Sequence, residues 1–163
     1  MKYSAEDYVE IQSLLGTYCF AADWGDLDQM MSIFHPDIRL RPHFEGDEEY
    51  VGTAAGRDWF VGYFQRIRAP RRFVRHKVFL PAIVLSDGEP RSSMYFDSES
   101  VRKDDAVVST AIGRYDSRFA RHEGRWLISE HTIISYYTRR NSDFTVTRDT
   151  PQPAVLRSYR TDV

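Results

Sequence analysis

The feature that most constrains the fold is a change in the spacing of apolar residues near residue 73. Before this point, apolar side chains recur every three or four residues, which is the period of an amphipathic helix. After it, they alternate with polar ones in four stretches separated by short turn-forming clusters. Strands with such short connections are antiparallel neighbours. We therefore expect an α+β domain, with helices first and a long curved sheet after them.

Three helices are predicted in the first half. Ser4 and Asp7 have the spacing of a capping arrangement, and Gly25 breaks the first helical pattern. A second, short helix is expected to stop near Pro36, since proline interrupts helical hydrogen bonding. A short strand, IRLRPHF, follows, and a third helix covers residues 53–69. The apolar residues expected on the inner faces of these helices are Tyr8, Ile11, Leu15, Tyr18 and Ala22, then Leu27, Met30, Met31 and Phe34, then Trp59, Phe60, Tyr63, Phe64 and Ile67.

Four strands are predicted in the second half, at residues 73–86, 91–102, 106–122 and 125–140. Such a sheet can bend around the helices into a cone with an open mouth, where a pocket for a small ligand is expected. We treat residues 1–140 as a single domain, which fits the chain length of 163 residues. The polar tail, residues 141–163, is expected to fray or to wrap a neighbouring subunit.

The charge balance argues against nucleic acid and anionic membranes as partners. The chain carries 22 basic and 24 acidic side chains, a net charge of −2, so it has no positive excess to attract them. Arginine does cluster between Arg66 and His76. The cluster could be an anion-binding patch, but we interpret it as a solvated connector face.

No segment predicts export, membrane insertion or metal binding. The N-terminus lacks the apolar run of a secretory signal, and no stretch approaches the roughly 20 apolar residues of a membrane span. A cytoplasmic protein is therefore expected. Cys19 is the single cysteine, falls among apolar residues and is predicted to be a small core residue. No two histidines have the i, i+4 spacing of a helical metal site, and no metal is expected.

Asp23 is the first candidate for chemistry. It directly follows an apolar run and lies between Ala22 and Trp24, where an ionised carboxylate needs a partner. Its simplest role is to end the first helix or to cap the second. Asp26 is better placed as the cap of the second helix, which leaves Asp23 available for another role.

The segments YCFAADWGDLDQMMSIFHPDI and VRHKVFLPAIVLSDGE, in this order of elements, resemble the nuclear transport factor 2-like superfamily. Within it, the chain is most similar to the SnoaL-like branch, which contains scytalone dehydratase and bile-acid dehydratases. The resemblance covers about residues 5–138. It implies a cone of helices packed against a curved, mostly antiparallel mixed sheet that encloses a pocket.

The resemblance also implies site residues. In dehydratase-like members an aspartate after the first helix faces a histidine on the strand after the third helix, and Asp23 and His76 fall on these positions. Tyr18 matches a tyrosine of the bile-acid type. The second active-site histidine of scytalone dehydratase has no counterpart in SSMYFDSESVRK, so its role is unfilled or moves to Glu99, where the bile-acid type has an acid. Ser135 falls where that type has an arginine, so neither substrate can be assumed.

An Asp–His pair in a water-poor pocket is a general acid–base pair. The carboxylate accepts the imidazole N–H and fixes the tautomer, and the far nitrogen moves a proton from carbon to a leaving hydroxyl. Tyr18 is expected to hydrogen-bond the substrate oxygen on which charge develops. His131 lies mid-strand on the same face as Ser135, and either lines the pocket to bind substrate or lies on the outer face.

These residues predict a lyase that needs no metal or organic cofactor. We expect a dehydratase-type elimination, or a related carbon–carbon lysis, on a small hydroxylated cyclic or aromatic compound. Isomerisation or cyclisation would use the same pair. The main alternative is a non-catalytic β subunit of an aromatic-ring-hydroxylating dioxygenase, and another is a ligand-binding or scaffold module of the same fold.

The strands also predict self-association. Ile112, Ile128, Ile134 and Tyr136 supply apolar area to both faces of the sheet, more than one layer of helices can cover. An uncovered apolar sheet face usually marks an interface. We expect a homo-oligomer, with a trimer first, as the family resemblance implies, and a dimer second.

Overall fold

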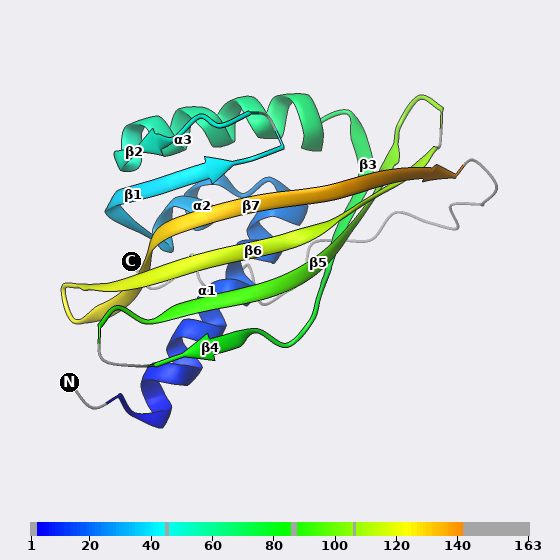
Figure 1. Cartoon of the computed structure of the whole chain (residues 1–163). Helices are drawn as coiled ribbons and strands as arrows, with labels where there is room; N and C mark the ends of the chain where they lie inside the picture. Colours follow the sequence, from blue (N-terminus) through cyan, green and yellow to red (C-terminus); the bar gives the residue numbers. More distant parts are fainter. Residues whose placement is uncertain (1–2, 45, 86–87, 106, 142–163) are drawn as a thin grey trace.

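The computed structural model describes residues 3–44, 46–85, 88–105 and 107–141 (Figure 1). Its helical elements are α1 (Ala5–Trp24), α2 (Leu27–Ser32), α3 (Gly52–Tyr63) and a π-helical turn, η1 (Phe64–Arg68). Its strands are β1 (Phe34–Pro42), β2 (Tyr50–Val51), β3 (Arg71–Val78), β4 (Ala82–Val84), β5 (Arg91–Arg102), β6 (Val108–His122) and β7 (Arg125–Asn141).

The strands of this part of the chain form one sheet in the order β2-β1-β7-β6-β5-β3, with β4 also paired to β5. Strands β1 and β7 are parallel, and the other pairings between described residues are antiparallel. The sheet is therefore mixed but mostly antiparallel, and the predicted α+β class is confirmed.

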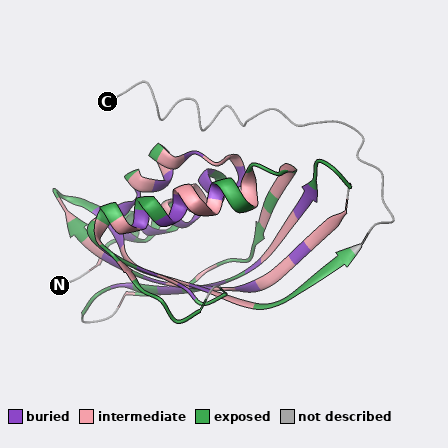
Figure 2. Ribbon diagram, turned by 90° about the horizontal axis from the view of Figure 1, so that it is seen from above, coloured by how far each residue is buried: buried purple, intermediate pink, exposed green. Residues whose placement is uncertain are grey.

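The helices cover one face of the sheet, and the sheet curves around them (Figure 2). The buried residues concentrate where α1 and α3 meet the strands. The core includes Ile11 and Leu15 of α1, Phe60 of α3 and Phe119 of β6, each at most 2% exposed. One layer of helices on a curved sheet leaves a concave space near the end of α1, and this space holds the site described below.

The start of α1 is fixed as the sequence predicted. The Ser4 hydroxyl accepts the Asp7 N–H at 3.2 Å, and the Asp7 carboxylate accepts the Ser4 N–H at 2.7 Å, which is a complete capping box. Asp7 also accepts the indole N–H of Trp126 at 2.7 Å. The capping box therefore ties the first helix to the beginning of β7.

Some elements differ from the prediction. Helix α2 ends at Ser32, so Phe34 and Pro36 lie in β1, where Phe34 pairs with Ile128 of β7. The stretch predicted as one strand at 73–86 contains two strands, β3 and β4. They are separated by an irregular segment that contains Pro81, which has no N–H for a sheet ladder. The two-residue strand β2 was not predicted, because two residues carry no recognisable alternation.

The residues that predicted an oligomer do not share one environment. Ile128 is fully buried in the core, Ile112 and Ile134 are partly buried, and Tyr136 is half exposed. Tyr136 and its neighbour Tyr137 lie at a register shift between β6 and β7. Self-association therefore stays a prediction, now based on exposed side chains rather than on Ile128.

Among the described residues, no helix combines the length and the apolar character needed to cross a bilayer. Residues 142–163, which make up most of the predicted tail, lie outside the described residues.

Candidate active site

The last turn of α1 presents Asp23. Gly25, with φ of +67°, ends the helix in the left-handed conformation that glycine adopts without steric cost. Asp26 caps α2 by accepting the Gln29 N–H at 3.1 Å, as predicted. The carboxylate of Asp23 is therefore not needed to cap α2, and it contacts β3 instead.

Asp23 and His76 form a closely bound pair between α1 and β3. Asp23 Oδ1 lies 2.6 Å from His76 Nδ1, and the two carboxylate oxygens also accept the His76 backbone N–H at 3.0 and 3.2 Å. The side chains of His76 and Asp23 are 4% and 9% exposed. A carboxylate accepts hydrogen bonds, so this contact is a hydrogen bond in the tautomer with the proton on Nδ1. The Nε2 atom is left without a partner among the described residues.

Arg68 of η1 binds the backbone on both sides of the Asp23–His76 pair. Its Nε–H donates to the Asp23 backbone carbonyl at 2.5 Å, and its Nη1 donates to the Arg71 carbonyl at 2.8 Å. Burial lowers the pKa of Arg68, and the charge of Asp23 opposes this effect. The guanidinium thus ties the end of α1 to the start of β3. For Arg68 and Arg71, both partly buried, the interpretation as a solvated connector face is wrong.

His76 lines a cavity of about 370 Å³ between the helices and the sheet. This volume is in the range of small-molecule sites. Part of its wall is flat and aromatic, because Phe96 and Tyr115 stack with ring centroids 4.3 Å apart and planes 15° apart. The other lining residues are Tyr18, Phe44, Tyr63, Ile67, Arg71, Val74, Ser98, Ser100, Ser109, Ala111, Ile133, Ser135 and Thr138.

Gly113 makes the aromatic wall possible. It pairs with Phe96 across β5 and β6. A Cβ at Gly113 would lie 2.1 Å from the Ile134 carbonyl oxygen and 2.8 Å from the Phe96 ring. Only glycine therefore lets the Phe96 ring lie flat over the sheet and against Tyr115.

Tyr18, the third residue of the predicted catalytic set, lies in the cavity wall. It is buried and lines the same cavity as His76. Its ring meets that of Tyr115 edge-on, with centroids 5.1 Å apart. Burial raises the pKa of both phenols well above the ordinary value, although a hydrogen bond with Tyr115 opposes the shift at Tyr18. Both hydroxyls therefore stay protonated. Because one of them donates to the other, one hydroxyl proton is left for a ligand.

His131 lies next to the site without lining the cavity. It is fully buried, with its ring centroid 4.4 Å from that of Tyr18 and 5.3 Å from that of Tyr115. Its Nδ1 lies 2.9 Å from the hydroxyl of Ser117, its partner across β6 and β7. Burial lowers the pKa of His131 to about 3, so the ring is neutral at physiological pH. The ring of His131 packs against those of Tyr18 and Tyr115 without lining the cavity itself.

The two remaining predicted binding residues lie on opposite faces of the sheet. Ser135 lines the cavity. Glu99 pairs with Arg75 at 2.8 Å and Lys77 at 2.7 Å, residues that alternate with His76 along β3. The hydrogen bond from Lys77 is the main reason that the pKa of Glu99 is lowered. The structure does not bring Glu99 to the cavity.

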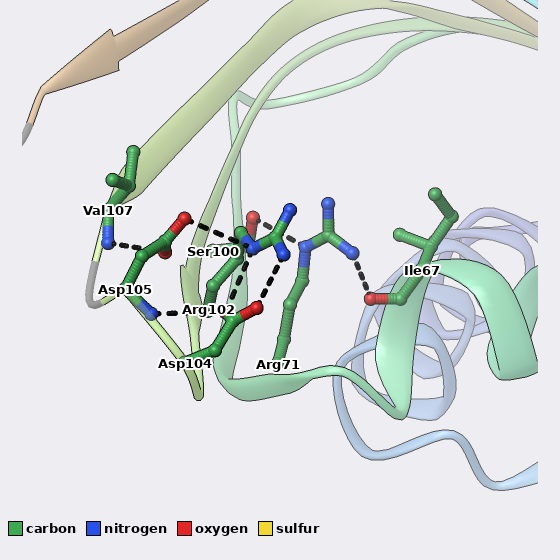
Figure 3. Close-up of polar contacts among 7 residues, drawn as sticks. All are labelled: Ile67, Arg71, Ser100, Arg102, Asp104, Asp105 and Val107. Atoms are coloured by element: carbon green, nitrogen blue, oxygen red, sulfur yellow. Dashed lines mark hydrogen bonds and ion pairs between the residues drawn. The ribbon is translucent and has the colours of Figure 1, made fainter.

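Sequence analysis missed Arg71 and a row of hydroxyls. Arg71 lines the cavity, its Nε donates to the Ser100 hydroxyl at 2.9 Å, and its Nη1 donates to the Ile67 carbonyl (Figure 3). Alternation along β5 puts Ser98 and Ser100 on one face. That this face is also the face of His76 follows from the register of β3 against β5, which one sequence does not reveal. The missed serine and threonine residues of the lining are Ser98, Ser100, Ser109 and Thr138, which join the predicted Ser135.

Cys19 is a buried core residue, as predicted. Burial, together with the charge of Asp23, raises the pKa of its thiol far above the usual range, so the thiol stays protonated. In the described part of the chain, no cluster of three or more His, Cys, Asp or Glu side chains could hold a metal ion.

Residues 3–132 match the model of the SnoaL-like domain family. The chain belongs to the SnoaL-like family. This match confirms the resemblance that the segments around Asp23 and His76 suggested, and it brings the chain into the nuclear transport factor 2-like superfamily. No curated protein sequence matches this SnoaL-like protein significantly.

Solved structures share the fold of this SnoaL-like protein. A protein from Novosphingobium aromaticivorans, assigned as an aromatic ring hydroxylase, is 24% identical, with a TM-score of 0.71 over 87% of this chain and 98% of that chain. One assigned as a scytalone dehydratase, from the same organism, is 15% identical, with a TM-score of 0.71 over 90% and 93%. The hexachlorocyclohexane dehydrochlorinase LinA-type3 of Novosphingobium barchaimii is 14% identical, with a TM-score of 0.72 over 88% and 95%.

Proposed function

We propose that this SnoaL-like protein is a cofactor-independent lyase that removes water from a small hydroxylated cyclic or aromatic compound. The observation that carries the proposal is the Asp23–His76 pair, with 2.6 Å between Oδ1 and Nδ1 and with His76 on the wall of a cavity. The fold shared with proteins named as a dehydratase and a dehydrochlorinase supports elimination chemistry.

His76 acts first as a base and then as an acid. Its Nε2 takes a proton from a carbon next to an activating carbonyl, and the electron pair of the broken C–H bond forms an enolate. The enolate then collapses to a C=C bond as the C–O bond to the hydroxyl breaks. The leaving oxygen receives the proton from Nε2 and departs as water. Asp23 stabilises the imidazolium that exists between the two steps.

Tyr18 stabilises the enolate oxygen. Its hydroxyl is protonated and lies in the same cavity as His76, so it can donate a hydrogen bond that strengthens as negative charge develops. The stacked rings of Phe96 and Tyr115 offer a flat apolar wall, which favours a ring as the body of the substrate. The hydroxyls of Ser98 and Ser135 make no hydrogen bond with another described residue and are available to substrate hydroxyl groups.

The test is a screen of hydroxylated cyclic and aromatic ketones for loss of water, monitored by the absorbance of the new double bond. The same screen, read by mass, detects loss of a small aldehyde, isomerisation or cyclisation, which share the first proton transfer. With a substrate in hand, His76→Ala should lower the rate by about 10²–10⁴-fold, and Asp23→Asn by a comparable factor. Glu99→Gln, on the other face of the sheet, is the matched control and should change little.

Two further results belong to the same experiment. The double variant should be hardly slower than the slower single variant, because groups that act as one unit are not additive. Activity should survive a strong chelator. Turnover by His76→Ala near the wild-type rate, or loss of turnover on chelation, would remove the proposal.

A second candidate is the non-catalytic small subunit of an aromatic-ring hydroxylase. The fold likeness to the protein assigned as an aromatic ring hydroxylase favours it. Such a subunit has no use for a buried Asp–His pair beside a cavity, which is why we prefer the lyase. Co-purification with a larger iron–sulfur protein, and no turnover in isolation, would favour the subunit.

We further propose that the protein works in the cytoplasm as a homo-oligomer, with a trimer as the first choice and a dimer as the second. Half-exposed Tyr136 and Tyr137 on β7 are the support from the fold. Light scattering at micromolar concentration should give a multiple of 19.1 kDa. A particle of the monomer mass would contradict it.

A further inference from the structure

One guanidinium in the cavity wall, that of Arg71, has no carboxylate partner among the described residues. Arg71 donates to two neutral acceptors, the Ser100 hydroxyl and the Ile67 carbonyl, and no carboxylate of the described residues pairs with it. Burial lowers the pKa of Arg71, the nearby Tyr63 phenol opposes this shift, and the charges of Arg102 and Arg140 add to it, yet a guanidinium stays protonated in proteins. A partly buried cation among neutral groups and like charges favours an anion.

The neighbouring arginine is in the opposite state. Arg102 pairs with Arg71 across β3 and β5, but Asp104 holds it in a two-point ion pair at 3.0 and 2.6 Å, and Asp105 lies 3.4 Å away (Figure 3). Arg102 is not among the residues that line the cavity. Within the described part of the chain, the two arginines thus differ in one respect that matters for a ligand: Arg102 has carboxylate partners, and Arg71 has none.

The position of Arg71 relative to His76 sets the distance between a group bound by Arg71 and the catalytic base. Ser98 pairs with His76 across β5 and β3, and Ser100, two residues further on the same face, accepts the hydrogen bond from Arg71. Two residues of a strand span about 7 Å, which is close to the length of one six-membered ring with a substituent. A group bound by Arg71 therefore lies about one ring away from the base.

We propose that Arg71 binds a carboxylate of the substrate, which makes the substrates ring compounds that carry a carboxylic acid at the end opposite the reacting carbon. A planar guanidinium matches a carboxylate in shape and charge. The reacting end of this assignment rests on the proposed lyase function, but the carboxylate end does not. The carboxylate acts as a handle that orients the ring along the wall of Phe96 and Tyr115, with its far end at His76.

The experiment measures binding rather than turnover, with benzoate and its neutral counterpart benzamide as probes. We expect the wild-type protein to bind benzoate about 10–100-fold more tightly than benzamide, as is typical of a charge-assisted hydrogen bond in a partly buried site. Arg71→Gln should abolish this preference. Arg102→Gln is the matched control. It should keep the preference for benzoate, because Arg102 is already paired with Asp104 and Asp105.

Further variants separate this proposal from the others. Arg71→Lys keeps the charge and should keep most of the preference, which also covers the case in which Arg71→Gln does not fold. His76→Ala should keep the preference in full, so a protein without lyase activity still supports the carboxylate site. Equal affinity of the wild-type protein for the two probes, or an unchanged preference in folded Arg71→Gln, would overturn the proposal.

Discussion

Two buried histidines both lie near the ring of Tyr115, and they differ in almost every property that acid–base chemistry needs. His76 lines the cavity, and its Nδ1 binds the Asp23 carboxylate at 2.6 Å. His131 packs against Tyr18 and Tyr115 without lining the cavity, and its Nδ1 lies 2.9 Å from the Ser117 hydroxyl. Burial alone therefore does not mark a catalytic histidine.

The partner and the access of the second nitrogen make the difference. A carboxylate partner stabilises a positive ring, whereas a hydroxyl partner in an apolar surrounding does not, and His131 is held neutral by burial. The Nε2 of His131 is buried with no partner among the described residues. His76 thus has the features of a residue that moves protons, and His131 has those of a residue that fills the core.

The largest expected effect comes from altering the hydrogen-bond partner of each histidine in turn. Asp23→Asn keeps the shape but removes the charge, and it should lower the turnover rate by about 10²–10⁴-fold. Ser117→Ala should change the rate by less than about tenfold, because the partner of His131 is remote from the reacting atoms. Steady-state kinetics of both variants check this, and equal losses in the two would erase the distinction between the histidines.

The second effect is on stability and reverses the roles. His131→Ala opens a cavity against Tyr18 and Tyr115 and leaves the Ser117 hydroxyl unpaired, so the free energy of unfolding should fall by about 2–4 kcal/mol. His76→Ala, on a wall that already faces a cavity, should cost clearly less. Urea unfolding followed by fluorescence measures both, and a larger loss in His76→Ala would contradict the assignment of His131 to the core.

The third effect is on the pH dependence of stability. The pKa of His131 is about 3 in the folded protein, against 6.5 for an ordinary histidine. Below pH 6.5 the unfolded chain binds a proton that the folded protein refuses, so stability falls as the pH drops toward 3. Relative to His131→Leu, the wild-type protein should lose about 1.6 kcal/mol between pH 6.5 and pH 5. Parallel pH profiles for the two proteins would show that His131 is not buried in neutral form.

The order of elements could be read from the sequence because local periodicity reports it. The capping box of Ser4 and Asp7, the helix break at Gly25 and the cap at Asp26 are all as predicted, since each depends on neighbours within a few residues. Pro36 misled the prediction, because a proline that stops a helix is also tolerated near the start of a strand such as β1.

The site could be predicted only in part. The roles of Asp23, His76 and Tyr18 came from the family resemblance. The structure brings His76 and Tyr18 to one cavity and places Asp23 against His76. The position of Glu99 on the other face follows from the pairing of Arg75 with Glu99 beside that of His76 with Ser98, and this register is a long-range property. Arg71 was missed for the same reason, because its cavity-facing position depends on contacts with η1 and β5.

The smallest expected effect concerns the support of Asp23. Arg68→Gln removes the guanidinium hydrogen bonds to the backbone carbonyls of Asp23 and Arg71. The pair should then be held less accurately, and kcat should fall by about tenfold with KM almost unchanged. Arg75→Gln, an exposed arginine of the neighbouring strand face, is the control. A rise in KM without a fall in kcat would assign Arg68 to substrate binding instead.

The central claim is that Asp23 holds His76 with the proton on Nδ1 and with Nε2 free toward the cavity. Long-range proton–nitrogen correlation spectra of isotopically labelled protein, recorded at alkaline pH, report the tautomer of each histidine directly and need no substrate. We predict a His76 ring protonated at Nδ1 only, a loss of this preference in Asp23→Ala, and no change at His131 in that variant. A His76 ring protonated at Nε2 in the wild-type protein would contradict the account.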